Sequence, residues 1–274
     1  MTVTKNDIMT ALAACGIRKG DTVLVHSSLK ACGYVEGGAD AVIDAFLELI
    51  GSEGTLVMPT LSQKDFKNAY RDWSMDRPSD VGFITETFRL RPESLRSDQA
   101  THSVAAQGAL AEWLVRDHGK YGKRAGAFGE TPFAACSPWQ KLYDINAKIL
   151  LFGVDMDSNT MKHLIEYVMT SDLLDKIDDD EARMRLASQL RGHADYADPA
   201  RVWFYSTGKG SQEVLEKAGL LRHATCGNAV FTCCRAKDTN DYMQKVYMTH
   251  PEDWYQPNAV EWLREAIRLS GTVL

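Results

Sequence analysis

Hydrophobic and polar residues follow two different periods in the first half of the chain, and these periods predict helices and strands in turn. Apolar positions at helical spacing predict a helix over 5–15, and a β-branched run predicts a strand over 20–29. A second helix is expected over 39–51 and a second strand over 54–62. A strand, a helix and a strand at this spacing predict a parallel pair with a right-handed crossover.

The rest of the chain continues this pattern less regularly. A long loop region rich in Trp, Asp, Arg and Pro is expected over 61–101, with one helix near 82–90. A strand or turn is expected at the start of 101–119, which then feeds a helix. Further strands are expected at 147–154, 201–206 and 229–236, before a terminal helix over 259–270. We therefore expect an α/β fold: a central, largely parallel sheet flanked by helices, with a smaller C-terminal subdomain.

Composition and charge narrow the class of protein. The chain has 274 residues, of which 45% are hydrophobic and 25% charged, as in an ordinary globular protein. This length favours one domain over 1–274, with a smaller subdomain at about 172–240. The net charge of -6 argues against nucleic acid and suits a cationic small molecule.

The sequence also gives expectations for the cellular location and the assembly of the protein. The apolar runs are too short to span a membrane and the N-terminus shows no apolar signal core, so a cytoplasmic protein without a membrane partner is expected. The six cysteines include no CxxC pair, which is typical of reduced core residues. A homodimer is compatible with these features and is left open.

Several familiar motifs are missing, and histidines near hydroxyl groups remain as the candidates for chemistry. There is no Walker A loop, GxGxxG, HExxH or GxSxG. His26 follows a predicted strand and precedes Ser27 and Ser28, which is where the carboxyl edge of a parallel sheet offers ligand sites. His102 precedes small residues that would let a ligand approach the backbone.

His163 and Glu166 form the most specific pattern. They lie three positions apart in a predicted helix and therefore share one face. A carboxylate one turn away can fix the tautomer of an imidazole, which is what a general base needs. The alternatives are an exposed structural pair, or a metal site that would need Asp155 and Asp157 as well; we expect no metal.

Six segments in order resemble one family. They are DTVLVHSSL, GTLVMPTLS, VGFITETFR, LRSDQATHSVAAQG, CSPWQKLYDINAKILLFGV and SNTMKHLIEY, and over roughly 15–170 they resemble the aminoglycoside 3-N-acetyltransferase family. The resemblance implies an antibiotic N-acetyltransferase fold, distinct from the GNAT fold, and a drug-resistance enzyme. Such an enzyme would acetylate the 3-amino group of aminoglycosides from acetyl-CoA as cosubstrate.

The resemblance also implies roles for individual residues. His163 would be the general base, oriented by Glu166, and His26 would position the thioester or assist the proton transfer. The cofactor path would be lined by Ser27, Ser28, Leu29, Thr101, His102, Ser103, Val104, Ser137 and Pro138. Direct transfer in a ternary complex is expected, whereas a covalent route would use Ser27, Ser28 or Cys32.

The acceptor is the least defined part of this hypothesis. A cationic aminoglycoside would be drawn by acids such as Asp72, Asp76, Asp80 and Glu86, or by the acidic run at 172–181. Where the family commonly has histidine and proline after arginine and serine, this chain has Asp98 and Gln99. Three alternatives therefore stay open: an acetyltransferase for another amine, such as a nucleotide-linked metabolite; a non-catalytic CoA-binding protein; and a metal-dependent hydrolase using His26, His102 and His163.

Overall fold

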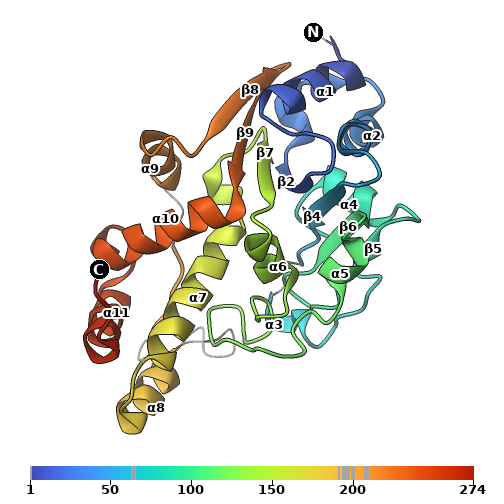
Figure 1. Cartoon of the computed structure of the whole chain (residues 1–274). Helices are drawn as coiled ribbons and strands as arrows, with labels where there is room; N and C mark the ends of the chain where they lie inside the picture. The colour runs from blue at the N-terminus through green and yellow to red at the C-terminus, as the bar shows by residue number, and fades with distance from the viewer. Residues whose placement is uncertain are drawn as a thin grey trace.

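One mixed sheet organises the chain (Figure 1). The structure, a computed structural model, describes residues 2–62, 64, 66–190, 192, 198, 201–206 and 210–274. Among these residues, seven strands form a sheet in the order β5-β6-β4-β2-β7-β9-β8. Their bounds are β2 Thr22–Ser27, β4 Thr55–Pro59, β5 Leu95–Arg96, β6 Val104–Gly108, β7 Lys148–Phe152, β8 Arg222–Cys226 and β9 Ala229–Arg235. Two short strands, β1 Thr2–Val3 and β3 Tyr34–Val35, pair separately.

The sheet is parallel at its centre and antiparallel towards both edges. Strand β2 pairs in parallel with β4 and with β7, as the crossover spacing predicts. The other ladders, β4–β6, β5–β6, β7–β9 and β8–β9, are antiparallel. The expectation of a largely parallel sheet thus holds only for the three central strands. Strands β8 and β9 are joined by only two residues, 227 and 228, and so short a connection permits only antiparallel pairing.

Helices cover both faces of this sheet. The α-helices are α1 Lys5–Ala14, α2 Gly38–Ile50, α3 Phe66–Ala69, α4 Phe83–Arg89, α5 Ala111–Val115, α6 Pro138–Asp144, α7 Met161–Asp175, α8 Asp180–Gln189, α9 Ser211–Lys217, α10 Ala236–Thr249 and α11 Pro257–Ser270. The short 3₁₀ helices are η1 Leu29–Cys32, η2 Met156–Ser158 and η4 Pro251–Asp253. Helices α1, α2 and α4 share one hydrophobic cluster, and α6, α7, α10 and α11 share another (Figure 1).

The alternation of side chains along the central strands explains these two clusters. In β2, Val23 and Val25 pack with α1 and α2, whereas Leu24 between them packs with the other cluster. Strand β7 alternates in the same way, with Leu150 in the first cluster and Leu151 in the second. A strand buried on both faces needs apolar residues at every position, which is why these runs are continuous in the sequence.

Most predicted elements are confirmed. The helices expected over 5–15, 39–51, 82–90 and 259–270 are α1, α2, α4 and α11, and the strands expected near 20–29, 54–62, 147–154 and 229–236 are β2, β4, β7 and β9. The strand expected over 201–206 is wrong, because only Val202 makes an isolated bridge, to Leu190. The apolar side chains of this stretch pack into the second cluster instead of forming a ladder.

The C-terminal part of the chain contributes to the central sheet. Strands β8 and β9 fall within the range of about 172–240 expected to form a subdomain, and β9 pairs with β7. Part of that range lies outside the described residues, and the division into a smaller subdomain stays a prediction.

All six cysteines are free and buried, which confirms their expected role in the core. No helix of the described chain is long and apolar enough to cross a lipid bilayer.

Gly153 joins the end of β7 to the loop beside the central strands. Its φ is +64°, and a Cβ built there would lie 2.4 Å from the Cβ of Ala31 in η1. Both the backbone conformation and the close approach to η1 therefore require glycine.

We expect Gly153→Ala to lower the free energy of unfolding by about 2–4 kcal/mol, because left-handed strain adds to steric overlap. Gly20→Ala is the matched control, since Gly20 has a φ of +83° but a methyl group added there would have no atom within 4 Å. The control should cost only about 1 kcal/mol in urea unfolding. Equal losses in the two variants would contradict the close packing at Gly153.

Candidate active site

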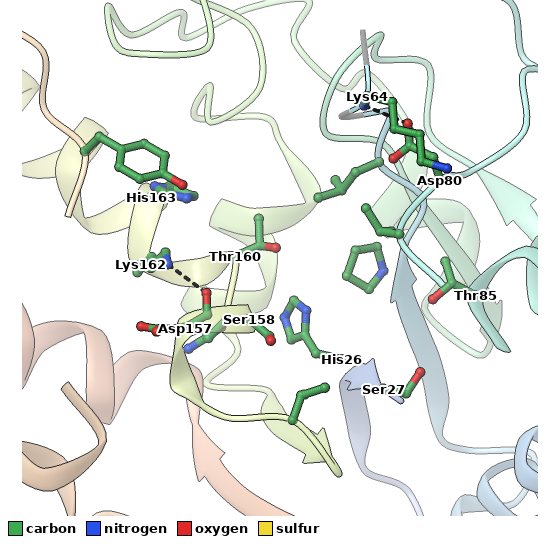
Figure 2. A pocket seen from close by; sticks show the side chains of 16 residues that line it. His26, Ser27, Lys64, Asp80, Thr85, Asp157, Ser158, Thr160, Lys162 and His163 are labelled. Atoms are coloured by element: carbon green, nitrogen blue, oxygen red, sulfur yellow. Dashed lines mark hydrogen bonds between the residues drawn. The ribbon is translucent and has the colours of Figure 1, made fainter. Parts of the chain in front are cut away.

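A cavity of about 510 Å³ opens where the three parallel strands end (Figure 2). Its wall includes His26 at the end of β2, Pro59 at the end of β4 and Val154 just after β7. The other lining residues come from the end of β2, from α4 and the segment before it, from η2 and the start of α7, and from the segment at 201–206: Ser27, Leu61, Lys64, Asp80, Val81, Thr85, Asp157, Ser158, Asn159, Thr160, Lys162, His163 and Tyr205. The carboxyl edge of parallel strands is where α/β proteins commonly bind ligands.

His163 and Glu166 are in contact inside this wall. The His163 Nδ1 lies 2.9 Å from the Glu166 Oε2, and the side chains are only 8% and 1% exposed. The second carboxylate oxygen, Oε1, accepts a hydrogen bond from the backbone N–H of Ser206. The pair is therefore not an exposed surface pair, which was one alternative. A carboxylate at Nδ1 favours the tautomer that carries its proton there and leaves the Nε2 lone pair free to act.

Aromatic rings hold the imidazole of His163 in place. Phe128 meets it edge-on with ring centroids 4.9 Å apart, and Tyr205 lies across it at 5.0 Å. Tyr205 also lines the cavity and is partly exposed. The sequence gives no sign that Tyr205 and Ser206 belong to the site, because the apolar residues of their segment predict a strand.

His26 has a different environment from His163. It is buried, and its Nε2 has no hydrogen-bond partner among the described residues. Burial, together with the nearby positive charge of Lys162, lowers the pKa of His26 to about 3. His26 is therefore neutral near pH 7. Its imidazole can form a hydrogen bond with a ligand, but it is too weak a base to take up a proton from one.

The start of α7 is shaped by its own polar residues. The Asn159 Oδ1 accepts a hydrogen bond from the Met161 N–H at 3.1 Å, as expected of a residue that caps the helix. Ser158 ends η2 and lines the cavity, and the residue at the N-cap of α7 is Thr160. These short polar residues direct α7 so that His163 faces the cavity.

The residues predicted for the cofactor path fall in two groups. Ser27 lines the cavity, and Ser28 and Leu29 follow it into η1, where the Ser28 N–H donates to the Phe152 carbonyl at 2.9 Å. The second group lies behind the wall and is fully or almost fully buried: Thr101, His102, Ser103, Val104, Ser137 and Pro138. Their predicted contact with a cofactor stays a prediction.

The buried group has clear structural partners. The His102 Nδ1 lies 2.9 Å from the Thr101 Oγ1, and its ring packs on Phe128, which also contacts His163. Burial lowers the pKa of His102 well below its ordinary value. The Ser103 hydroxyl donates to the Thr60 carbonyl at 2.9 Å, and the Ser137 hydroxyl caps α6.

The predicted acceptor-binding acids are mostly away from the cavity. Asp80 lines it. Asp72 pairs with its exposed neighbour Arg71, and Glu86 forms an ion pair of 2.6 Å with Arg89. Asp76 is exposed and is not among the lining residues. Of the four acids predicted to bind an aminoglycoside, Asp80 alone therefore lines the cavity.

The departure from the family pattern at 98–99 is accommodated by hydrogen bonds. The Asp98 carboxylate accepts the indole N–H of Trp73 at 2.8 Å. The Gln99 side-chain oxygen accepts the Thr101 N–H at 2.9 Å, and its amide donates to Tyr70 and Thr131 at 3.1 Å each. This segment thus supports the buried loop before β6.

Lys162, Thr160 and Thr85 line the cavity, although no sequence motif points to them. Lys162 is adjacent to a candidate histidine in the sequence, but only the fold shows that its side chain reaches the same space. No group of three or more His, Cys, Asp or Glu side chains in the described part of the chain is placed to hold a metal ion.

These features define an α/β protein with a buried histidine–carboxylate pair at an open cavity. The sequence model of the aminoglycoside 3-N-acetyltransferase family matches residues 24–248. The chain belongs to this family.

Individual relatives agree with this assignment. The chain is 37% identical over 186 residues to the SPbeta prophage-derived aminoglycoside N(3')-acetyltransferase-like protein YokD of Bacillus subtilis (strain 168), covering 60% of this chain and 65% of that protein. It is 30% identical over 182 residues to aminoglycoside N(3)-acetyltransferase VIII of Streptomyces fradiae, covering 60% of each. The matched region thus spans less than two thirds of the length of these relatives.

Solved structures share the fold. The crystal structure of YokD superposes with a TM-score of 0.64 and 26% identity, covering 89% of this chain and 98% of that one. A structure described as AAC-IIIb binary with CoASH gives a TM-score of 0.69 at 20% identity, covering 94% and 99%. The α/β fold with a central sheet flanked by helices is therefore confirmed as that of the family.

The low pKa of His26 predicts a pH-dependent stability. Between pH 6.5 and about 3 the unfolded chain binds a proton at His26 that the folded protein does not. Stability from this residue thus falls by about 1.4 kcal/mol for each pH unit of acidification. Urea unfolding from pH 7 to 5 should show a shallower loss in His26→Gln than in wild type, by about 2 kcal/mol in total. Parallel pH profiles would contradict a buried neutral His26.

Proposed function

We propose that this protein is an acetyl-CoA-dependent N-acetyltransferase that acts on the 3-amino group of aminoglycosides. The observation that carries the proposal is the buried His163–Glu166 contact of 2.9 Å at the wall of an open cavity. One relative is named as an aminoglycoside N(3)-acetyltransferase and another as an aminoglycoside N(3')-acetyltransferase-like protein, and these names suggest the reaction and the first acceptors to test.

The chemistry needs a base beside the acceptor nitrogen. An amine is mostly protonated near pH 7 and has no lone pair for attack until a base removes a proton. In the proposed reaction the Nε2 of His163 takes that proton, and Glu166 stabilises the resulting imidazolium. The amine nitrogen then forms a bond to the acetyl carbonyl carbon, and the C–S bond of the thioester breaks. The nitrogen loses a second proton as the amide forms, the leaving thiolate gains one proton to give the free thiol of CoA, and the proton taken by His163 is released to solvent.

The cavity has features that suit acetyl-CoA as cosubstrate. Its volume of about 510 Å³ is in the range of small-molecule sites. The buried Nε2 of His26 has no described partner, so a carbonyl or amide group of the bound thioester could satisfy it. His26 would then position the thioester while His163 moves the proton, a division that the two environments support.

Direct transfer is favoured over an acyl-enzyme. Cys32 is buried, and burial raises the pKa of its thiol to about 12, which makes it a poor nucleophile. Ser27 lines the cavity, but its hydroxyl makes no hydrogen bond to a basic side chain within the described part of the chain. A ternary complex of protein, acetyl-CoA and amine needs neither residue to react.

Location and assembly complete the proposal. We propose a cytoplasmic protein, where acetyl-CoA is available, without a nucleic-acid or membrane partner; homodimer formation stays open. The alternative acceptor, an amine such as a nucleotide-linked metabolite, stays open, because Asp80 alone of the four acids predicted to draw an aminoglycoside lines the cavity.

The test of this proposal is thiol release from acetyl-CoA with a panel of aminoglycosides. We expect His163→Ala to lower kcat by about 100-fold or more while leaving the Kd of CoA unchanged, because the base acts only in the chemical step. Glu166→Gln, which is nearly isosteric, should lower kcat by a smaller factor.

His250→Ala is the matched control, since it removes an exposed imidazole outside the cavity, and it should retain full activity. Turnover that survives in His163→Ala would remove His163 from the mechanism. CoA binding with no thiol release from any amine would instead identify a non-catalytic binding protein.

A further inference from the structure

Charge alone does not explain how the cavity would bind an aminoglycoside. The charged residues among its described lining residues are two cations and two anions, Lys64, Lys162, Asp80 and Asp157. An aminoglycoside carries its ammonium groups on saturated rings, whose faces consist largely of C–H groups. A protein binds such a face by packing a flat apolar surface against it. Recognition at this cavity therefore needs a side chain with such a surface.

Tyr205 offers a flat aromatic surface to this cavity. It is the only Phe, Tyr or Trp among the described residues that line the cavity, and it is 41% exposed. Its hydroxyl makes no hydrogen bond within the described part of the chain. Much of the Tyr205 side chain is thus free to contact a ligand.

The residues on both sides of Tyr205 fix its position in the wall. Phe204 is buried and meets the ring of Trp262 edge-on, with centroids 5.3 Å apart. On the other side, the backbone N–H of Ser206 donates to the buried Glu166 carboxylate. The backbone of Tyr205 is therefore anchored at two points before a ligand arrives. A ligand that packs on an anchored ring has less disorder to remove, which favours binding.

Tyr205 also lies directly beside the proposed base. Its ring centroid is 5.0 Å from that of His163, and the two ring planes are inclined by 34°. Burial raises the pKa of Tyr205, and the negative charges of Glu166 and Asp157 add to this effect. The side chain is therefore a neutral phenol near pH 7. It presents an uncharged ring next to the place where the acceptor nitrogen must lie.

We propose that Tyr205 is the platform for the acceptor: one amine-bearing ring of the aminoglycoside packs on the Tyr205 ring, and this places the 3-amino group at the Nε2 of His163. The inference rests on the proposed N-acetyltransferase function and adds a residue that binds its substrate. The face of an aromatic ring is negative, so it attracts both an ammonium group and the C–H groups beside it. A residue without formal charge thereby contributes to binding a polycation.

The place of Tyr205 favours the acceptor over the adenine of acetyl-CoA, which is also able to stack on an aromatic ring. Adenine is separated from the reacting thioester by the whole pantetheine arm and the diphosphate. Tyr205 contacts the imidazole that must meet the acceptor nitrogen. A ring in that position is therefore at the reacting end of the cosubstrate and on the side of the acceptor.

The test compares binding and turnover in four proteins: wild type, Tyr205→Phe, Tyr205→Leu and Tyr242→Leu. The Kd of each aminoglycoside and of CoA is measured by calorimetry, and kcat and KM by thiol release. Tyr242→Leu is the matched control, because Tyr242 in α10 is 40% exposed and does not line the cavity.

We expect Tyr205→Leu to raise the Kd and KM of aminoglycosides by about tenfold, because the aromatic face is lost. Tyr205→Phe keeps that face and should stay within about twofold of wild type. The Kd of CoA should be unchanged in all variants, and Tyr242→Leu should match wild type throughout. If Tyr205→Leu does not fold, Tyr205→Met replaces it with the same expected rise.

Two results would overturn the platform. A lower kcat in Tyr205→Leu with an unchanged Kd for aminoglycosides would limit Tyr205 to supporting His163. A higher Kd for CoA with unchanged aminoglycoside binding would assign the ring to the cosubstrate. The proposed function fails separately, if wild type binds aminoglycosides but releases no thiol; the Kd values then still decide the role of Tyr205. Wild type that binds no aminoglycoside would reject both.

Discussion

The candidate site depends on the burial of one carboxylate. Glu166 is 1% exposed, and a buried carboxylate is costly unless hydrogen bonds satisfy both oxygens. His163 supplies one bond from its own helix, and Ser206 supplies the other from a segment 40 residues away in sequence. This requirement ties α7 to the segment at 201–206, and that segment in turn brings Tyr205 against the imidazole.

The sheet fixes the other half of the site. Because β2 is flanked in parallel by β4 and β7, the carboxyl ends of all three strands meet at one edge. His26 is the penultimate residue of β2, and the segment after β7 leads through η2 into α7. The two histidines therefore line one cavity from different elements, β2 and α7, and one is neutral by burial while the other is supported by a carboxylate. This difference in surroundings gives each a separate chemical role in the proposed transfer.

The sequence predicted what depends on local pattern. Continuous apolar runs identified β2, β4 and β7, and helical spacing brought His163 and Glu166 together. It could not predict the antiparallel edges, because pairing partners such as β7 and β9 lie about 80 residues apart. Nor could it show that His102 is buried against Phe128. It also could not show that Lys162 reaches the cavity, or that Glu86 forms an ion pair with Arg89. Those outcomes are decided by tertiary packing, which single-sequence patterns do not record.

The most direct test of the account is to follow the acetyl group itself. Acetyl-CoA labelled with ¹³C at the acetyl carbonyl is mixed with the protein and an amine, and carbon NMR identifies the compound that receives the label. The account predicts that the signal moves from the thioester to an amide of the amine, and that this transfer is lost in His163→Ala. Label that appears as free acetate, or that stays in the thioester with every amine, would contradict it.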